Sequence, residues 1–100
     1  MNNWNNQNTD QLLDAIMLLR TKSEAKKFFR DLLTSGEIIE FGKRWQTARM
    51  LSNKASYIDI EKQTGLSSAT IARVSQLLNQ GKGGYRMIIA RLAGEQHRLS

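Results

Sequence analysis

The sequence predicts an all-α chain of six helices that includes a helix-turn-helix. Apolar residues recur at helical intervals along most of the chain, and no segment of strand length alternates between apolar and polar residues. Four of the apolar segments follow an Asn, Ser or Thr with a carboxylate or amide residue three positions later, which is the pattern of an N-terminal capping box. The 100 residues include no proline, so none of these helices is interrupted by one.

Three amphipathic helices are expected in the first half of the chain, over residues 9–20, from residue 21 onward, and over residues 34–52. Each carries apolar side chains at helical spacing, which predicts one face turned towards a core. The expected capping pairs are, in chain order, Asn8 with Gln11, Thr21 with Glu24, and Thr34 with Glu37.

Three further helices are expected in the second half, over residues 57–64, over residues 67–79, and from residue 85 to about residue 93. Ser56 and Asp59 are the expected capping pair of the first of them. The run Gly81-Lys82-Gly83-Gly84 separates the last two helices. It lacks the glycine spacing and the Ser or Thr after lysine that a phosphate-binding loop requires, so it is interpreted as a hinge.

One domain is expected, over residues 9–93. The asparagine-rich residues 1–8 are interpreted as a disordered tail, and residues 94–100 as a frayed C-terminal tail. The first residues lack the basic and apolar regions of a signal peptide, and no apolar run approaches the roughly 20 residues that a membrane span requires. A cytoplasmic location without a membrane partner is therefore expected.

The residue composition argues against an enzyme. The chain has no cysteine, which excludes disulfides and thiolate metal sites. Its one histidine, His97, lies in the polar C-terminal tail without a second metal ligand at helical spacing. No pair of nucleophile and base stands out either. We therefore expect no catalytic residue, no metal and no cofactor.

The charge of the chain indicates a polyanionic partner. Lys and Arg number 15 against 9 Asp and Glu, so the formal net charge is +6. Residues 54–91 contain six basic and two acidic residues, so most of the excess lies in this part. A concentration of positive charge around a helix-turn-helix favours double-stranded DNA as the partner.

The helix-turn-helix is expected between residues 57 and 79. Gly65 stands where the turn needs a positive φ, which glycine adopts without strain. An ordinary helical corner would share this glycine, so the motif also depends on an apolar interface between the two helices. The residues expected in that interface are Ile60, Leu66, Ile71 and Val74.

The second helix of the motif presents a small and polar face opposite its apolar one. Ala69 and Ala72 would let the helix approach base edges, and Arg73 and Gln76 can donate to guanine and adenine. Hydroxyl side chains at the helix start suit phosphate contacts. The expected DNA-contacting residues are Ser67, Ser68, Ala69, Thr70, Ala72, Arg73 and Gln76.

Several short motifs resemble the tryptophan repressor superfamily when they are taken in order. They are Leu32-Leu33-Thr34, Gly42 with Arg44, and Ala69-Thr70-Ile71 with Arg73 and Ser75. A narrower set is similar to the YerC/YecD branch of that superfamily. It comprises Glu37-Ile38, Arg44-Trp45-Gln46, Ala48-Arg49-Met50-Leu51, and Leu78-Asn79 with Gly81, Gly84 and Tyr85. The resemblance spans about residues 12–92.

The resemblance implies a particular assembly. The fold of the family is a six-helix chain in an intertwined homodimer, in which the first three helices and the last interlock between subunits. The two helix-turn-helix motifs project from this shared core. The short apolar helices of this chain are consistent with such an arrangement, because helices of this length bury too little surface alone.

The resemblance also bears on the ligand of the tryptophan repressor, which is tryptophan held beside the recognition helix. Thr34, Arg44 and Arg73 match positions that contact this ligand. Val74 and Leu77 replace a glycine and a serine there. We interpret the pocket as filled by these two side chains, so tryptophan is not expected to bind. The three matching residues would then be vestigial contacts or would serve DNA phosphates.

The leading functional hypothesis is a repressor-like transcriptional regulator that binds operator DNA as a homodimer without tryptophan. The alternative is a helical protein–protein interaction module of the antitoxin or adaptor kind. A third hypothesis, the DNA-binding part of a transposase or recombinase, would require a separate catalytic partner. Salt-dependent DNA binding distinguishes the leading hypothesis from the interaction module.

Overall fold

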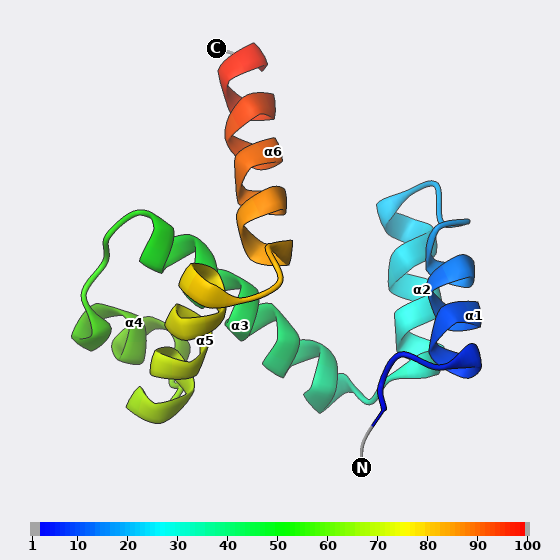
Figure 1. Ribbon diagram of the computed structural model, residues 1–100, viewed down its shortest axis with the longest axis horizontal. Coiled ribbons are helices and arrows are strands. Elements are labelled where there is room, and N and C mark those ends of the chain that lie inside the picture. The colour runs from blue at the N-terminus through cyan, green and yellow to red at the C-terminus, as the bar shows by residue number, and fades with distance from the viewer. Residues whose placement is uncertain (1–2, 100) are drawn as a thin grey trace. The chain divides into compact units, whose positions relative to one another are not determined.

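The computed structural model describes residues 3–99, and this part of the chain is all-α (Figure 1). Its helices are α1 (Gln7–Ile16), α2 (Lys22–Leu32), α3 (Ser35–Ser52), α4 (Tyr57–Thr64), α5 (Ser68–Gln80) and α6 (Gly84–Leu99). The predicted fold class and the six predicted helices are confirmed. None of the described helices is long and apolar enough to cross a membrane.

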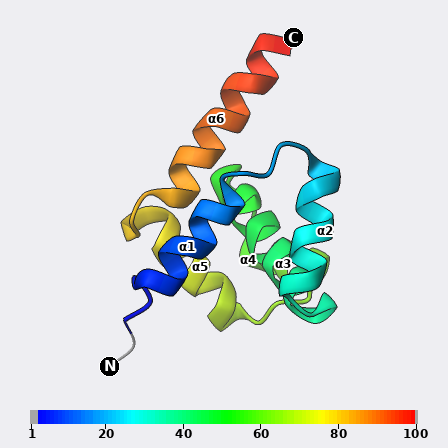
Figure 2. The same cartoon turned by 90° about the vertical axis from the view of Figure 1, so that its right-hand side faces the viewer.

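The chain divides into two compact units within α3. The first comprises residues 1–38, with α1, α2 and the start of α3, and the second comprises residues 39–100. In the first unit α1 and α2 run in opposite directions (Figure 2). No side chain described in α1 or α2 is buried, so this unit has no closed core in the single chain.

The start of α1 differs from the prediction. Asn6, and not Asn8, caps the helix, because the Asn6 side chain accepts from the Thr9 amide at 3.0 Å. The Thr9 hydroxyl accepts in return from the Asn6 amide at 2.9 Å, which completes a capping box without Gln11. The predicted pair of Asn8 and Gln11 is wrong, since a hydroxyl three residues after Asn6 serves the same purpose.

The end of α1 lies four residues before the predicted one, at Ile16. Beyond Ile16 the chain forms turns, in which the Leu18 and Leu19 amides donate to carbonyls three residues earlier at 3.1 Å. The Thr21 hydroxyl accepts from the Glu24 amide at 3.1 Å, and a Glu24 carboxylate oxygen accepts from the Arg20 amide at 2.9 Å. The predicted Thr21–Glu24 capping pair is therefore confirmed.

The second unit is built around the packing of α4 against α5. Its core consists of Ile60, Leu66 and Ile71, with Met50, Leu51 and Ala55 packed against them. Figure 1 shows α4 and α5 beside the C-terminal half of α3. Because residues 50–55 close this core from one side, α3 and the following loop hold the helix-turn-helix in place.

The last helix, α6, is longer than predicted and runs to Leu99. The helical conformation therefore continues through Gly94, where a frayed tail was expected. His97, the histidine considered above, lies among residues whose side chains the structure does not describe. The division into a domain at 9–93 and two tails remains a prediction.

Candidate nucleic-acid interface

The turn between α4 and α5 has the geometry that the motif requires. Gly65 has φ 74° and ψ 4°, the left-handed conformation, and its amide donates to the Glu61 carbonyl at 2.9 Å. The Ser56 hydroxyl caps α4 by accepting from the Asp59 amide at 3.1 Å. The predicted turn residue and the predicted capping pair are both confirmed.

Thr64, which the sequence reasoning did not single out, stabilises the same turn. Its buried hydroxyl donates to the Ile60 carbonyl at 2.7 Å and accepts from the Leu66 amide at 3.1 Å. The Thr64 hydroxyl and the Leu66 amide are thereby both hydrogen-bonded inside the core, where an unpaired polar group would cost about 1–3 kcal/mol. A hydroxyl residue directly before the glycine was the available sequence signal.

The first turn of α5 uses some of the hydroxyls that were expected to contact phosphate. Ser67 is the N-cap: its hydroxyl oxygen accepts from the Thr70 amide at 3.2 Å. The same hydroxyl donates to the Thr70 hydroxyl oxygen at 3.1 Å, so its proton is occupied within the chain. Ser68 and the Thr70 hydroxyl proton have no such bond among the described contacts, and the Ser68 side chain is exposed.

The body of α5 has the two faces that the sequence predicts. Ile71 is fully buried and Val74 is 2% exposed, on the side that packs into the unit. Ala69, Ala72, Arg73 and Gln76 are exposed. The structure thus separates the expected core residues of α5 from its expected DNA-contacting residues. The contact of these residues with DNA remains a prediction.

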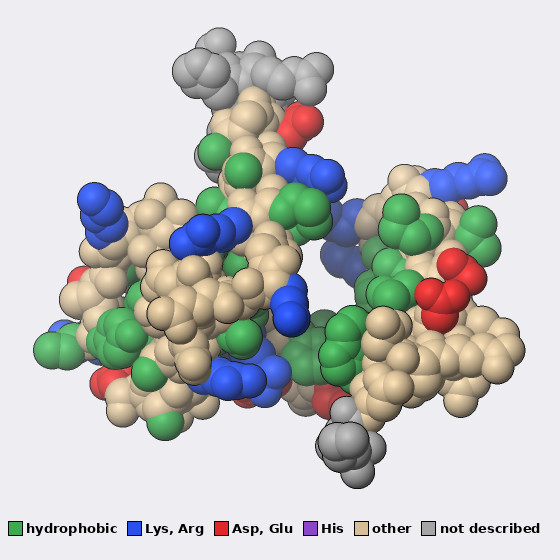
Figure 3. All heavy atoms as spheres, viewed as in Figure 1, with side chains coloured by type: hydrophobic (Ala, Val, Ile, Leu, Met, Phe, Trp, Pro, Cys, Tyr) green, Lys and Arg blue, Asp and Glu red, His purple; other side chains and the backbone are tan. Residues whose placement is uncertain are grey.

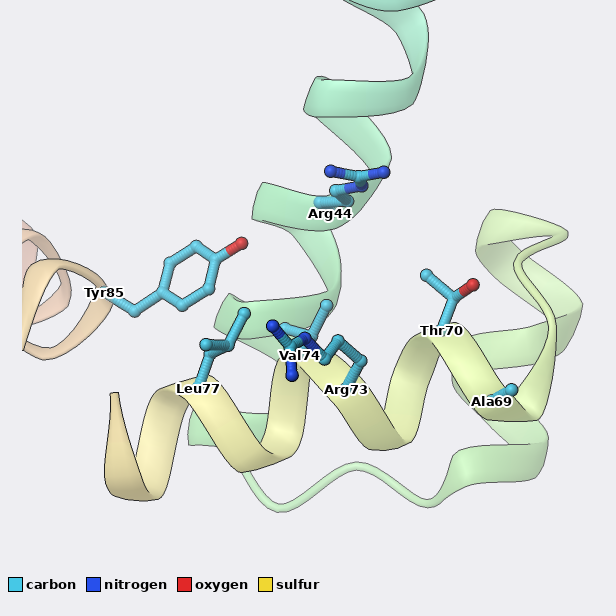
Figure 4. Close-up of a pocket in the computed structure, with 7 residues that line it drawn as sticks. All are labelled: Arg44, Ala69, Thr70, Arg73, Val74, Leu77 and Tyr85. Carbon is cyan, nitrogen blue, oxygen red and sulfur yellow. The ribbon is translucent and has the colours of Figure 1, made fainter. Parts of the chain in front are cut away.

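A hollow of about 450 Å³ lies between α3, α5 and α6. Figure 4 shows its lining, with Arg44 on α3, Tyr85 on α6, and the other labelled side chains rising from α5. The lining residues are Arg44, Ala69, Thr70, Arg73, Val74, Leu77 and Tyr85. Val74 and Leu77 line this space, and they do not fill it, so the expectation of a filled pocket is wrong.

Val74 and Leu77 differ in their exposure. Val74 is 2% exposed and Leu77 is 37% exposed, yet both side chains border free space beside α5. The sizes of these two side chains therefore did not predict the hollow.

The two arginines of the hollow come from different helices. Arg44 makes an exposed ion pair with Glu40, with Nε 3.4 Å from Oε2, and its guanidinium lies 5.7 Å from the centre of the Phe41 ring. Such an exposed pair contributes little, typically about 0–1 kcal/mol, so Arg44 can exchange it for another partner. Arg73 is exposed on α5. Both residues can therefore offer positive charge to an anion.

Thr34, the third residue that the resemblance marks as a ligand contact, does not line the hollow. It caps α3 in a complete capping box with Glu37: the Thr34 hydroxyl accepts from the Glu37 amide at 3.1 Å. The Thr34 amide in turn donates to a Glu37 carboxylate oxygen at 2.9 Å. The hydrogen bond from the Thr34 amide, and secondly one from the Thr34 side chain, lower the pKa of Glu37 below its usual 4.5, since both stabilise the carboxylate.

Tyr85 is the main addition that the structure makes to the candidate site. Its ring stacks on Trp45 of α3, with ring centres 6.2 Å apart and an angle of 21° between the planes. The Arg49 guanidinium lies 6.0 Å from the centre of the same Trp45 ring. The sequence marked Tyr85 only as part of an apolar face and of the resemblance, because its partner lies forty positions earlier on another helix.

Comparison with known proteins identifies the family of this chain. Residues 7–93 match the family described as Trp repressor protein. The chain belongs to the Trp repressor family. It is 42% identical over 83 residues to YerC of Bacillus subtilis (strain 168), an uncharacterized protein, covering 83% of this chain and 80% of YerC. The predicted resemblance to the family and to its YerC-like members is confirmed.

Solved structures show the same fold. A TrpR-like protein from Eubacterium eligens ATCC 27750 has a TM-score of 0.86 and 40% identity, covering 90% of this chain and 93% of that protein. A solved protein from Staphylococcus aureus has a TM-score of 0.83 and 39% identity, with 88% of each chain covered. The six helices therefore form a Trp repressor-like fold.

Membership in the family has functional consequences at a coarse level. The family consists of non-enzymatic regulators, which confirms that the chain is not an enzyme, and membership implies a regulator that binds DNA. In the described residues no group of three or more His, Cys, Asp or Glu side chains is placed to hold a metal ion.

Proposed function

We propose that this protein is a homodimeric transcriptional regulator that binds operator DNA in a sequence-specific manner without tryptophan. The observation that carries the proposal is the division of α5 into two faces. Ile71 and Val74 anchor the helix in the core, while Arg73 and Gln76 project into solvent between small residues. A helix of this kind can enter the major groove, which is wide enough for it.

The charges around α5 support a nucleic-acid partner. Arg73 on α5 and Arg44 on α3 both border the hollow, and neither is buried. Phosphate contacts from such residues would position the helix, and direct contacts from Arg73 and Gln76 would read base edges. Glu61 on the preceding helix is exposed as well and would favour sites where it does not face a phosphate.

Exposed apolar side chains support a homodimer as the binding form. Several of them lie on α3 and α6, on α1 and in the turn that follows it, and Figure 3 shows hydrophobic side chains at the visible surface along α6 and on the α1–α2 unit. They include Leu13, Met17, Leu18, Ile39, Phe41, Met87, Ile88 and Leu92. So much exposed apolar surface indicates a partner, and a second copy would also supply the symmetric pair of recognition helices.

The polar lining of the hollow argues against tryptophan. Two guanidinium groups could receive a carboxylate, but none of the lining residues is a carboxylate that could receive an ammonium group. A bound amino acid would hold its ammonium close to positive charge and short of a strong acceptor, at a cost of about 1–3 kcal/mol. The volume of the hollow admits a small molecule, and its chemistry disfavours a zwitterion.

Selection of bound sequences from random DNA duplexes, repeated at two salt concentrations, tests the proposal. A regulator of this type should enrich a palindromic sequence with half-sites about one helical turn apart. Its affinity should also fall steeply between about 50 and 200 mM salt, because phosphate contacts release counterions. Failure to enrich any sequence, together with binding that ignores salt, would favour the alternative of a protein–protein interaction module.

A further inference from the structure

The C-terminus of α5 lacks a cap from its own residues. It has no basic residue in its last turn, and Gly81, the C-cap, has an extended backbone. The Gly81 amide donates to the Leu77 carbonyl at 2.8 Å. The carbonyls of the residues that follow Leu77 have no partner within the helix, as at every helix end.

Arg86 on α6 supplies that cap from across the hinge. Its Nε donates to the Leu78 carbonyl at 2.9 Å, and its Nη2 donates to the Asn79 carbonyl at 3.1 Å. The planar guanidinium suits this fork, since it presents two donors at a fixed spacing. The positive charge also lies where the α5 dipole is negative, so both effects favour the same arrangement.

Gly81 makes this close return of the chain feasible. A Cβ at Gly81 would overlap the Leu77 carbonyl oxygen, which belongs to the helix backbone and cannot move away cheaply. The hinge between α5 and α6 consists only of residues 81–83, and its first residue, Gly81, packs closely against the Leu77 backbone. It brings α6 back against α5, and these two helices are in contact.

The residue before Arg86 ties the same turn of α6 to a different helix. Tyr85 stacks on Trp45 of α3, as described above. Two consecutive residues at the start of α6 thus contact α3 and the end of α5. A helix that is held at two points by different partners has little freedom to rotate about either one.

We infer that Arg86 is a positioning residue that sets the orientation of the recognition helix α5 relative to α6. The inference rests on the proposed function, in which α6 contributes to the dimer and α5 enters the major groove. The two recognition helices must then match two half-sites at once. If the contact between Arg86 and the end of α5 is loosened, each helix can still bind its own half-site, but the dimer loses its preference for one spacing between the two half-sites. The glycine-rich hinge alone would leave that spacing poorly defined.

The experiment compares Arg86→Met, Arg86→Lys and the control Arg91→Met, which removes the same charge from an exposed position on the same helix. The probes are the selected palindromic duplex and versions with one base pair added or removed at its centre. We expect Arg86→Met to reduce the preference for the natural spacing by about tenfold, which corresponds to about 1.4 kcal/mol. Affinity for a non-specific duplex should change as it does in Arg91→Met.

Arg86→Lys separates geometry from charge. A single ammonium group keeps the charge but cannot reproduce the two-donor fork, so this variant should recover only part of the spacing preference. Full recovery in Arg86→Lys, or an unchanged preference in Arg86→Met, would overturn the inference. Wild-type protein that binds no duplex selectively would instead show that the proposed function is wrong.

A measurement without DNA tests the contact between Arg86 and the end of α5 independently. Hydrogen exchange of the backbone amides of residues 79–81 reports how firmly the last turn of α5 is held. These amides should exchange several-fold faster in Arg86→Met than in Arg91→Met, while the core amides of α4 exchange at the same rate in both. Equal exchange at residues 79–81 in the two variants would show that Arg86 does not hold the helix end.

Discussion

Arg73 is exposed although it lies next to the buried face of α5. It is exposed on α5 beside small residues, and it borders the hollow that lies between α3, α5 and α6. Val74, its neighbour, is nearly fully buried. Adjacent residues of one helix thus divide between solvent and core, and this division makes Arg73 available to DNA while the helix stays anchored.

Replacing Arg73 by alanine should weaken operator binding without unfolding the protein. If Arg73 reads a base, the loss should be about 1–3 kcal/mol and should relax selectivity at one position of the site. Fluorescence anisotropy with the selected duplex and its single-base variants measures both effects. Arg91→Ala, which removes an exposed charge from α6, is the control. A uniform loss across all duplexes would identify Arg73 as a phosphate contact instead.

Tryptophan should neither bind the protein nor alter its affinity for DNA. Val74 and Leu77 leave the hollow open, so the prediction rests on its polar lining, which offers no strong acceptor to an ammonium group. Isothermal titration of wild-type protein with millimolar tryptophan should give no binding heat. The double variant Val74→Gly, Leu77→Ser restores the residues that the tryptophan repressor has there and should bind more tightly than the wild type. Clear binding heat with the wild type would contradict this prediction.

At the scale of the elements, the helix starts are the most strongly specified features. Thr21 and Thr34 each cap a helix, and in both cases a glutamate three residues later accepts a backbone amide. Each capping interaction of this type typically contributes about 1 kcal/mol to stability. The start of α3 matters most, because this helix extends from the first unit into the second.

The α3 cap should give the protein a measurable sensitivity to acid. The pKa of Glu37 is lowered in the folded chain by hydrogen bonds from Thr34, so the carboxylate contributes stability above its unfolded pKa. That contribution is lost as the pH falls through the lowered folded pKa. An NMR titration should therefore place the Glu37 midpoint below 4.5, and Glu37→Gln should flatten the acid side of the stability profile. A midpoint at or above 4.5 would contradict the capping-box interpretation.

At the scale of the whole molecule, the single chain leaves much apolar surface uncovered. Among the described residues the fully buried side chains lie in the second unit, on α3, α4 and α5. Helices α1 and α2 have none, and Ile39 at the start of the second unit is 59% exposed. Both helices leave apolar side chains exposed in the single chain, which is the physical argument for a second copy.

The protein should therefore be a dimer whose stability depends on its concentration. Sedimentation equilibrium at micromolar concentration should give twice the chain mass of 11.4 kDa. The melting temperature should rise with protein concentration, because dissociation and unfolding are linked. A folded monomer at micromolar concentration, with a melting temperature independent of concentration, would contradict the prediction.

The local features of this protein were predictable because their causes lie within a few residues. The capping pairs at Thr21, Thr34 and Ser56, and the left-handed Gly65, all follow from contacts across one helical turn. The same holds for the two faces of α5, which the period of the helix determines. The choice of Asn6 over Asn8 escaped prediction, because these two asparagines lie only two positions apart and each is followed three residues later by a side chain that can complete a capping box, Thr9 or Gln11.

Sequence alone was therefore enough for the helices, the turn, the apolar face of α5 and the membership in a family of DNA-binding regulators. The hollow and the contact between Arg86 and the end of α5 could be found only in the folded chain, because their parts come from separate helices. The size of a side chain says little about whether it fills a space, as Val74 and Leu77 show, since its direction depends on the packing of the helix that carries it. Arg86 reaches the carbonyls of α5 only because the hinge returns α6 to that helix end, and no local pattern specifies that return.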